Sequence, residues 1–93
     1  MSRENYVYIL ANKFNTLVYV GSTSNLVERV AQHKSLGGGY TAKYRITKLV
    51  WFEVFPDYNS AYAFERKLKG WKRAWKDALI EKDTPDWEEL VPK

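Results

Sequence analysis

The sequence predicts a small α/β (more strictly α+β) domain: a three-stranded antiparallel central sheet flanked by helices, in the order β-β-α-β-α-α. Three observations predict this fold. Two stretches rich in β-forming residues, 5–11 and 17–21, are separated by a short turn segment. A third apolar stretch follows at 48–55, and the remaining segments show helical spacing. Ninety-three residues suffice for one domain, which we expect to span 1–93.

The first two strands are predicted to form a hairpin. The intervening segment contains Asn12 and Asn15, which favour turns, and we expect a loop of about four residues. If Ala11 pairs with Thr16, Tyr8 lies opposite Tyr19. Facing residues of an antiparallel pair share one side of the sheet, so both tyrosines are expected on the same face.

The first helix is predicted to begin at a capping box formed by Asn25 and Glu28. Apolar residues from Leu26 onward follow the helical period, and the glycines at 37–39 are expected to stop the helix. A loop is predicted next. The strand at 48–55 is apolar almost throughout, which is typical of a strand at the centre of a sheet.

Two more helices are predicted in the second half of the chain. Asn59 or Ser60 is expected to cap a helix that runs through 61–69 and is interrupted by Gly70. A further helix is expected at 71–82, ended by the Thr-Pro pair at 84–85. After this break, Trp87 and Leu90 are expected to fold back onto the core.

Composition limits the classes of function. The chain has no cysteine, which excludes disulfides and thiolate metal sites. No signal peptide or membrane-spanning stretch is recognisable, so a cytoplasmic protein without membrane association is expected. The formal charge of +4 and a pI near 9.3 favour a polyanionic partner, although many small basic proteins bind none.

Three side chains are unusual for mere packing. Arg29 and His33 lie one helical turn apart at the border of the apolar stripe, where a partly buried arginine and a boundary histidine are the simplest interpretation. Glu65 falls on an apolar stripe of the next helix. A carboxylate there needs a partner or a metal ion, and Lys69 at i+4 is the alternative to a metal.

Residues 66–76 contain six Lys or Arg and no acid, with Trp71 and Trp75 between them. The tryptophans are expected to belong to the core stripe of the helix. The basic side chains favour a nucleic-acid surface, because nothing nearby in the sequence offsets their charge. We therefore predict nucleic-acid contacts from four residues of this stretch: Lys69, Lys72, Arg73 and Lys76.

Together these features resemble the GIY-YIG nuclease domain, and most closely the small stand-alone bacterial proteins of the URI type. Tyr6-Val7-Tyr8 stands in place of the GIY motif and Tyr19-Val20-Gly21 in place of YIG. Arg29, His33 and Glu65 stand where that family has its helix arginine, its His or Tyr, and its metal-binding glutamate. The segments GGGYTAKYR, LVWFE and KGWKRAWKDALIEKDTPDWEEL extend the resemblance over nearly the whole chain.

The resemblance implies a catalytic set that converges on one cleft: Tyr8, Tyr19, Arg29, His33 and Glu65. Tyr19 is expected to deprotonate the attacking water or to relay its proton, and Tyr8 to orient water or phosphate beside it. A tyrosine releases its proton reluctantly at neutral pH, so a nearby cation or base is needed. Arg29 would stabilise the charge that develops on the phosphate, and His33 would assist proton transfer.

The resemblance also implies a single divalent cation, Mg²⁺ or Mn²⁺, held by Glu65 with water. DNA is the expected partner, contacted further by Ser22, Lys43 and Arg45. Two departures from the family pattern stand out: Tyr6 replaces the first glycine of GIY, and Thr84 replaces an asparagine, which puts one buried hydrogen bond in doubt. No DNA-targeting module is recognisable in these residues, and we expect specificity to come from the domain itself or from a protein partner.

Three functions remain open at this point. The first is a metal-dependent endonuclease that cuts DNA, with single-stranded or branched DNA favoured by the interleaved aromatic residues. The second is a nucleic-acid-binding module of the same fold with little or no cleavage. The third is a structural partner protein in DNA repair. A complete catalytic set favours the enzyme, because binding alone does not need a glutamate facing a phosphate.

Overall fold

The computed structural model describes residues 4–35 and 39–92. Three strands, β1 (Asn5–Ala11), β2 (Val18–Thr23) and β3 (Lys48–Phe55), form one antiparallel sheet in the order β2-β1-β3. Four helices accompany them: α1 (Leu26–Lys34), α2 (Gly39–Lys43), α3 (Tyr58–Lys69) and α4 (Arg73–Asp83). The predicted fold and element order are confirmed, with α2 as a short helix where a loop was expected.

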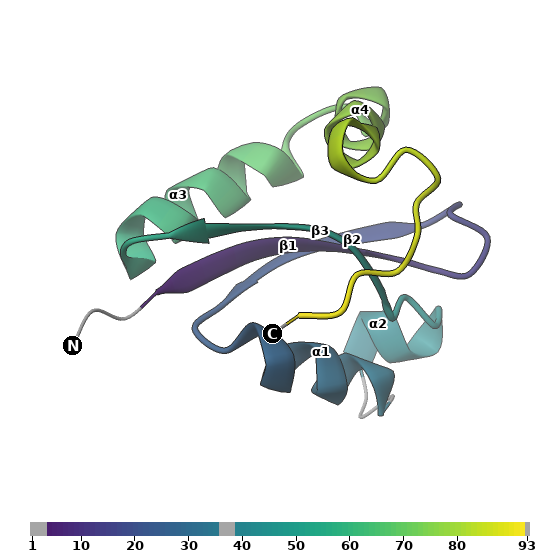
Figure 1. Ribbon diagram of the computed structural model, residues 1–93, viewed down its shortest axis with the longest axis horizontal. Coiled ribbons are helices and arrows are strands. Elements are labelled where there is room, and N and C mark those ends of the chain that lie inside the picture. Colours follow the sequence, from purple (N-terminus) through teal and green to yellow (C-terminus); the bar gives the residue numbers. More distant parts are fainter. Residues whose placement is uncertain (1–3, 36–38, 93) are drawn as a thin grey trace.

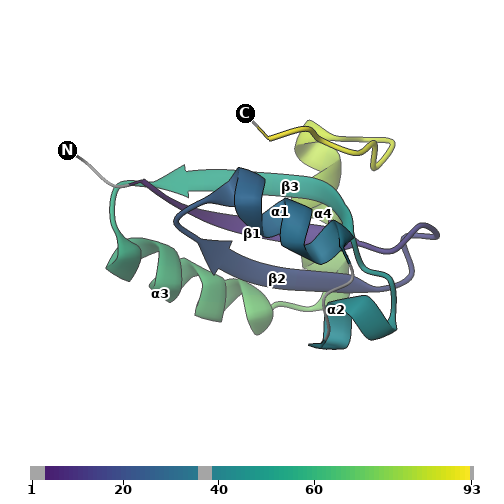
Figure 2. The same ribbon diagram turned by 90° about the horizontal axis from the view of Figure 1, so that it is seen from below.

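The sheet separates two layers of helices. Helices α3 and α4 cover one face, and α1 and α2 lie on the other (Figure 1). Seen from below, α3 runs alongside the outer edge of β2 (Figure 2). The C-terminal segment passes beside β3, where the Leu90 amide donates to the Leu49 carbonyl at 2.8 Å. Edge strand β2 thus lies between α1 on one face and α3 on the other.

The period-two alternation of β1 divides the core in two. Val7, Ile9 and Ala11 pack in the layer with α3 and α4, together with buried Trp87. Tyr8 and Leu10 pack on the opposite face against the apolar stripe of α1, and Leu90 packs against this second cluster. The prediction that Trp87 and Leu90 return to the core is confirmed.

The position of β3 in the sheet was predicted wrongly. β1 is the central strand, because its residues from Val7 to Ala11 are buried by helices on both faces. β3 is an edge strand whose second half is open to solvent, with Phe52 38% and Val54 47% exposed. A continuous apolar run therefore does not distinguish a central strand, buried on both faces, from an edge strand that is buried over only half of its length.

The hairpin register also differs from the expected one. Ala11 pairs with Val18, and the loop covers residues 12–17, which is longer than predicted. Tyr8 faces Gly21, and Tyr19 faces Leu10. Since the shift is by two residues, not one, both tyrosines still lie on the same face of the sheet, next to each other on a diagonal.

The helix boundaries follow from their caps. The Asn25 side chain accepts from the Glu28 amide at 3.1 Å, so the predicted N-cap is present. The reciprocal bond of a capping box is not formed, because the Glu28 carboxylate accepts from the Asn25 side chain and the Asn25 backbone amide donates to Thr23. α3 begins earlier than expected, because the Asp57 carboxylate caps it by accepting from the Ser60 amide at 2.7 Å. α1 ends at Lys34; of the three glycines expected to stop it, 37 and 38 lie outside the described residues.

α4 begins two residues later than expected, and its two tryptophans have different environments. Trp71 packs on the core cluster beside α3, whereas Trp75 is 56% exposed, so its predicted core position is wrong. At the other end of the helix, Thr84 is buried. Its hydroxyl lies 2.9 Å from the Val50 carbonyl oxygen, and this position therefore does supply a hydrogen-bond link from α4 to β3.

Among the described residues, no helix has both the length and the apolar character needed to cross a membrane.

Candidate active site

Tyr8 is at the centre of a polar cluster between β1, β2 and α1. Its side chain is 1% exposed, and its hydroxyl lies 3.0 Å from His33 Nε2 and 3.4 Å from Arg29 Nε. The Tyr19 ring completes the cluster, with its centroid 6.4 Å from that of Tyr8 and 5.6 Å from that of His33. Four residues predicted from the sequence are therefore neighbours in space.

Gly21 makes room for this arrangement on β2. A Cβ atom added to Gly21 would lie 2.5 Å from the Tyr8 hydroxyl oxygen and 3.0 Å from Cε2 of Tyr19. The first distance is too short for a Cβ atom unless Tyr8 moves, and the second is tighter than an ordinary contact. The last residue of the YVG motif is thus needed because it lets the Tyr8 phenol lie directly over the edge strand.

The hydrogen bonds of the cluster favour one arrangement of the protons. Arg29 only donates, and in this arrangement the Tyr8 hydroxyl accepts from Arg29 and donates its own proton to His33 Nε2. His33 then carries its own proton on Nδ1, which lies 2.9 Å from the Thr41 hydroxyl oxygen and donates to it. This assignment makes His33 a neutral imidazole with a fixed tautomer.

Burial and charge favour the same protonation states. The pKa of Tyr8 is raised, first by burial; the hydrogen bond from Arg29 lowers it, and the nearby Tyr19 and Glu65 raise it further. The pKa of His33 is lowered, by burial and then by the positive charge of Arg29. Around neutral pH, Tyr8 is therefore a protonated donor and His33 a neutral acceptor.

Thr41 was not among the predicted site residues. It is 7% exposed, lies on the unexpected helix α2, and reaches the site only through His33. A threonine in a glycine-rich segment gives no signal of its own. The pairing depends on how α2 folds against α1, which residue spacing does not reveal.

Glu65 approaches the same edge strand from the α3 side. Its Oε1 accepts from the Ser22 hydroxyl at 2.5 Å, and its Oε2 lies 2.6 Å from the Lys69 ammonium. Ser22 directly follows Gly21 on β2, and the negative charge of Glu65 is the weakest of the effects on the pKa of Tyr8, which it raises. Of the five residues expected in one cleft, four therefore share the α1 face of the sheet, whereas Glu65 meets β2 from the α3 face.

The Lys69 alternative is realised: the ion pair raises the pKa of Lys69, mainly through its hydrogen bond with Glu65. The Lys69 side chain is 51% exposed, whereas that of Glu65 is only 12% exposed. The carboxylate is thus held in place by its surroundings, and the ammonium can move away into solvent.

The chemistry of Glu65 fits a hard divalent cation. Within residues 4–35 and 39–92, no three His, Asp or Glu side chains gather as a complete metal site. Mg²⁺, however, is commonly held by one or two carboxylates, with water and substrate phosphate completing the shell. Glu65 meets that requirement as the single protein ligand.

The basic residues predicted to bind nucleic acid are placed very differently. Lys43 and Arg45 are exposed near α2, and Lys72 is exposed at the start of α4. Lys76 reaches back to the Lys69 carbonyl oxygen at 3.4 Å. These side chains are spread over two sides of the domain and do not form one continuous row.

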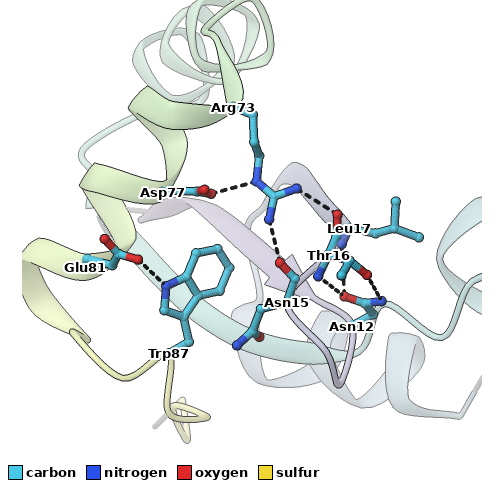
Figure 3. Close-up of polar contacts among 8 residues, drawn as sticks. All are labelled: Asn12, Asn15, Thr16, Leu17, Arg73, Asp77, Glu81 and Trp87. Carbon is cyan, nitrogen blue, oxygen red and sulfur yellow. Dashed lines mark hydrogen bonds and ion pairs between the residues drawn. The ribbon is translucent and has the colours of Figure 1, made fainter.

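Arg73 is committed to the fold. Its Nε donates to Asp77 at 2.6 Å, and its two terminal nitrogens donate to the carbonyls of Asn15 and Thr16 at 2.6 and 2.8 Å (Figure 3). Its guanidinium also lies 5.8 Å from the centre of the Trp87 ring. Arg73 therefore links the hairpin loop to α4, and we leave it out of the proposed DNA surface.

Comparison with known proteins extends this picture. The profile of the GIY-YIG catalytic domain family matches residues 4–78. A UPF0213 protein of Natronomonas pharaonis is 35% identical over 85 residues, covering 90% of this chain and 99% of the relative. A UPF0213 protein of Clostridium perfringens is 40% identical over 77 residues, covering 82% of each chain.

A solved structure shows the same fold. The solution NMR structure of a UPF0213 protein from Bacillus halodurans aligns with a TM-score of 0.58 and 29% identity, covering 91% of this chain and 90% of that one. The names of these relatives state no activity. The matched range, 4–78, spans the positions of Tyr8, Tyr19, Arg29, His33 and Glu65.

Proposed function

Because the chain belongs to the GIY-YIG family, whose domains are of the nuclease type, we propose that it is a metal-dependent endonuclease that hydrolyses DNA phosphodiester bonds. The observation that carries this proposal is the contact of Tyr8 with both His33 and Arg29 beneath Gly21. Burying a phenol and an imidazole beside a half-buried guanidinium is costly unless each is paired. A packing role alone would be met more simply by apolar side chains.

Each residue has a role that its contacts allow. Arg29 uses two of its five N–H donors on Tyr8 and Gln32, which leaves donors for a phosphate oxygen as negative charge builds there. Tyr8, kept protonated, orients the reacting groups by its hydroxyl. Tyr19, which is only half-buried, would take the proton of the attacking water. His33 would assist this proton transfer through Tyr8, whose hydroxyl lies 3.0 Å from His33 Nε2.

Glu65 would hold Mg²⁺ or Mn²⁺ after Lys69 swings into solvent. When bound, the divalent cation would polarise the scissile phosphate and stabilise the leaving oxygen. The displaced Lys69 ammonium would remain close by, where it can pair with the backbone phosphate of the substrate. The ion pair of this structure is then the resting arrangement of the metal ligand.

Single-stranded or branched DNA is the substrate class that the surface favours. Trp75 is exposed at the start of α4, with Lys72 and Lys76 in neighbouring positions of the helix. An exposed aromatic ring among cations suits an unpaired base stacked above a phosphate backbone. A closed duplex offers no free base face for this contact.

One observation favours the second function, a binding module without cleavage. Lys69 neutralises Glu65 at 2.6 Å, as it would in a domain that has no use for a metal. The two functions differ in a simple way. An enzyme needs the cation to displace Lys69, whereas a binding module keeps the ion pair when DNA is bound.

The test is cleavage of labelled single-stranded, duplex and forked DNA by the purified protein, with Mg²⁺, Mn²⁺ or EDTA. We expect cutting of the single-stranded or forked substrates with either metal and none in EDTA. Tyr19→Phe, which removes only the hydroxyl, should abolish the cutting, and this control excludes a contaminating nuclease. DNA binding without cleavage of any substrate would instead establish the binding module.

A further inference from the structure

A second basic region lies away from the tyrosines, in a cavity of about 390 Å³. Different parts of the chain build it: the hairpin loop, the last residue of α1, the connection from α2 to β3, the start of β3, and the C-terminal segment. Its lining residues are Lys13, Lys34, Arg45, Thr47, Lys48 and Glu89. We call it the basic cavity.

The charges of the basic cavity are far from balanced. Four cationic side chains line it, with Glu89 as the one carboxylate of its lining. Glu89 pairs with Lys34. Lys48 donates to the neutral Asn15 side chain at 2.7 Å, so this hydrogen bond does not cancel its charge. The positive charge of Lys13, Arg45 and Lys48 therefore remains available to an anion.

The fold fixes Arg45 at an unusual backbone position. Its φ of 53° is left-handed, a conformation that glycine or asparagine normally occupies after a helix. The Arg45 amide nevertheless donates to the Ala42 carbonyl at 3.3 Å, and the next amide donates to Thr41 at 2.8 Å. This backbone conformation is less favourable for an arginine than for a glycine, and it sets the position from which the Arg45 side chain lines the cavity.

The basic cavity is connected to the tyrosine cluster through α1 and through the chain that runs from α2 to β3. Lys34 directly follows His33 on α1, and Arg45 comes four residues after Thr41, the partner of His33. One flexible strand bound at the cluster can therefore continue to the cavity along α1 and α2. A cation-rich hollow with a hydroxyl donor suits a tetrahedral phosphate, which accepts several hydrogen bonds at once.

We propose that the basic cavity binds a backbone phosphate of the nucleic acid, outside the cleaved bond, and so holds the strand on the enzyme. This proposal rests on the proposed function for the identity of the ligand. Glu89 has a defined part in it: the carboxylate occupies Lys34 in the free protein and must give way to the phosphate. Removing Glu89 should therefore strengthen binding, the opposite effect to removing a cation.

The experiment measures binding of a fluorescently labelled single-stranded oligonucleotide by anisotropy in EDTA, over a range of salt concentrations. Lys13→Gln and Arg45→Gln should each weaken binding and lower the log–log salt slope by about 0.7, the value for one lost phosphate contact. Glu89→Gln should bind more tightly than the wild type. Lys82→Gln, which removes one charge from the end of α4, is the matched control and should change little.

Because binding is measured in EDTA, without cleavage, the experiment tests the basic cavity separately from the nuclease activity. If Lys13→Gln and Arg45→Gln match Lys82→Gln, or Glu89→Gln weakens binding, the proposal is overturned, whatever the nuclease assay gives. If wild-type protein cuts no DNA but the four variants behave as expected, only the nuclease proposal fails. Thermal unfolding of each variant checks that Arg45→Gln remains folded, and Glu89→Gln tests the cavity independently of it.

A small-anion arm separates a strand from a free ion. Inorganic phosphate is titrated into ¹⁵N-labelled protein while amide shifts around 45–48 are followed. Phosphate shifts at these amides, combined with unchanged DNA binding by Lys13→Gln and Arg45→Gln, would show an inorganic anion site and overturn the strand proposal. Weakened DNA binding by both variants supports it.

Discussion

The polar groups that pack against the two faces of strand β2 differ in how firmly they are held. On the α1 face, Tyr8, His33 and Thr41 are nearly fully buried and joined in one chain of hydrogen bonds that Arg29 completes. On the α3 face, Glu65 faces an ammonium that is half in solvent. The first group is fixed before any ligand arrives, whereas the second can change partner. A preorganised half and an exchangeable half are what a metal-dependent nuclease needs, because the cation and the substrate must enter.

The largest effect on the cleavage rate is expected when the hydrogen-bonded group on the α1 face, the fixed half of the site, loses the charge of Arg29. Arg29→Ala removes the guanidinium proposed to meet the phosphate, and we expect a loss of about 10²- to 10³-fold in single-turnover cleavage, the usual cost of one such group. Some DNA affinity should also be lost, since Arg29 meets the phosphate before reaction as well. Arg29→Lys keeps the charge but not the planar set of donors, so its cleavage rate should lie between those of Arg29→Ala and the wild type. Equal rates for Arg29→Ala and wild type would remove Arg29 from the mechanism.

The second test fills the space over the edge strand. Gly21→Ala places a methyl group where the Tyr8 hydroxyl lies, so we expect a loss of about 1–3 kcal/mol in unfolding free energy and of most cleavage activity. Gly70→Ala is the matched control, because its new Cβ would meet only the Lys67 carbonyl at an ordinary 3.5 Å. Urea unfolding measures both. Similar stability of the two variants would show that Tyr8 is not held as described.

A smaller effect is expected from removing the last link of the fixed chain. Thr41→Val keeps the shape but leaves His33 Nδ1 without its acceptor, at a cost of about 1–3 kcal/mol. Thr41→Ser retains the hydroxyl and should behave like the wild type. Imidazole ¹⁵N shifts give a direct readout: we expect the Nδ1–H tautomer in wild type and Thr41→Ser, and a mixture in Thr41→Val. The same tautomer in all three proteins would leave Thr41 a packing role only.

The smallest expected effect is a dependence of stability on pH. The pKa of His33 is lowered in the folded protein, so the unfolded chain takes up this proton first as the pH falls. The contribution of neutral His33 is fully present above about pH 6.5, the ordinary histidine value, and is lost progressively below it. Urea unfolding at about pH 7.5 and about pH 5.5 should show a larger loss for wild type than for His33→Gln. Equal losses would mean that His33 accepts a proton freely in the fold.

The sequence predicted the fixed half of the site better than the exchangeable half. Tyr8 and Tyr19 were expected on one face, and this survived a wrong register because a shift of two residues preserves the side of the sheet. Helical spacing placed Arg29 and His33 on one face of a helix, and their assignment to the site came from the family resemblance. Thr41 could not be found in the same way, because its contact with His33 depends on a five-residue helix with no capping or periodic signal.

The errors elsewhere have a common physical cause. Hydrophobic pattern reports which residues prefer burial, but not which neighbour covers them. β3 was placed at the centre of the sheet although only its first half is covered, and Trp75 was placed in the core although it is exposed. Arg73 was read as a free surface cation because its acceptors are carbonyl oxygens of the hairpin loop, far away in the sequence.

The most direct test of the account is cleavage of forked DNA in saturating Mg²⁺ by Glu65→Gln, compared with Glu53→Gln. The first variant keeps the size of the side chain and removes the charge that would hold the cation; the second removes an exposed carboxylate from β3. We expect Glu65→Gln to lose at least about 10²-fold in rate while binding DNA as tightly as the wild type or more tightly, and Glu53→Gln to cut normally. Cleavage by Glu65→Gln at the wild-type rate would contradict the account, because Glu65 would then be only the partner of Lys69.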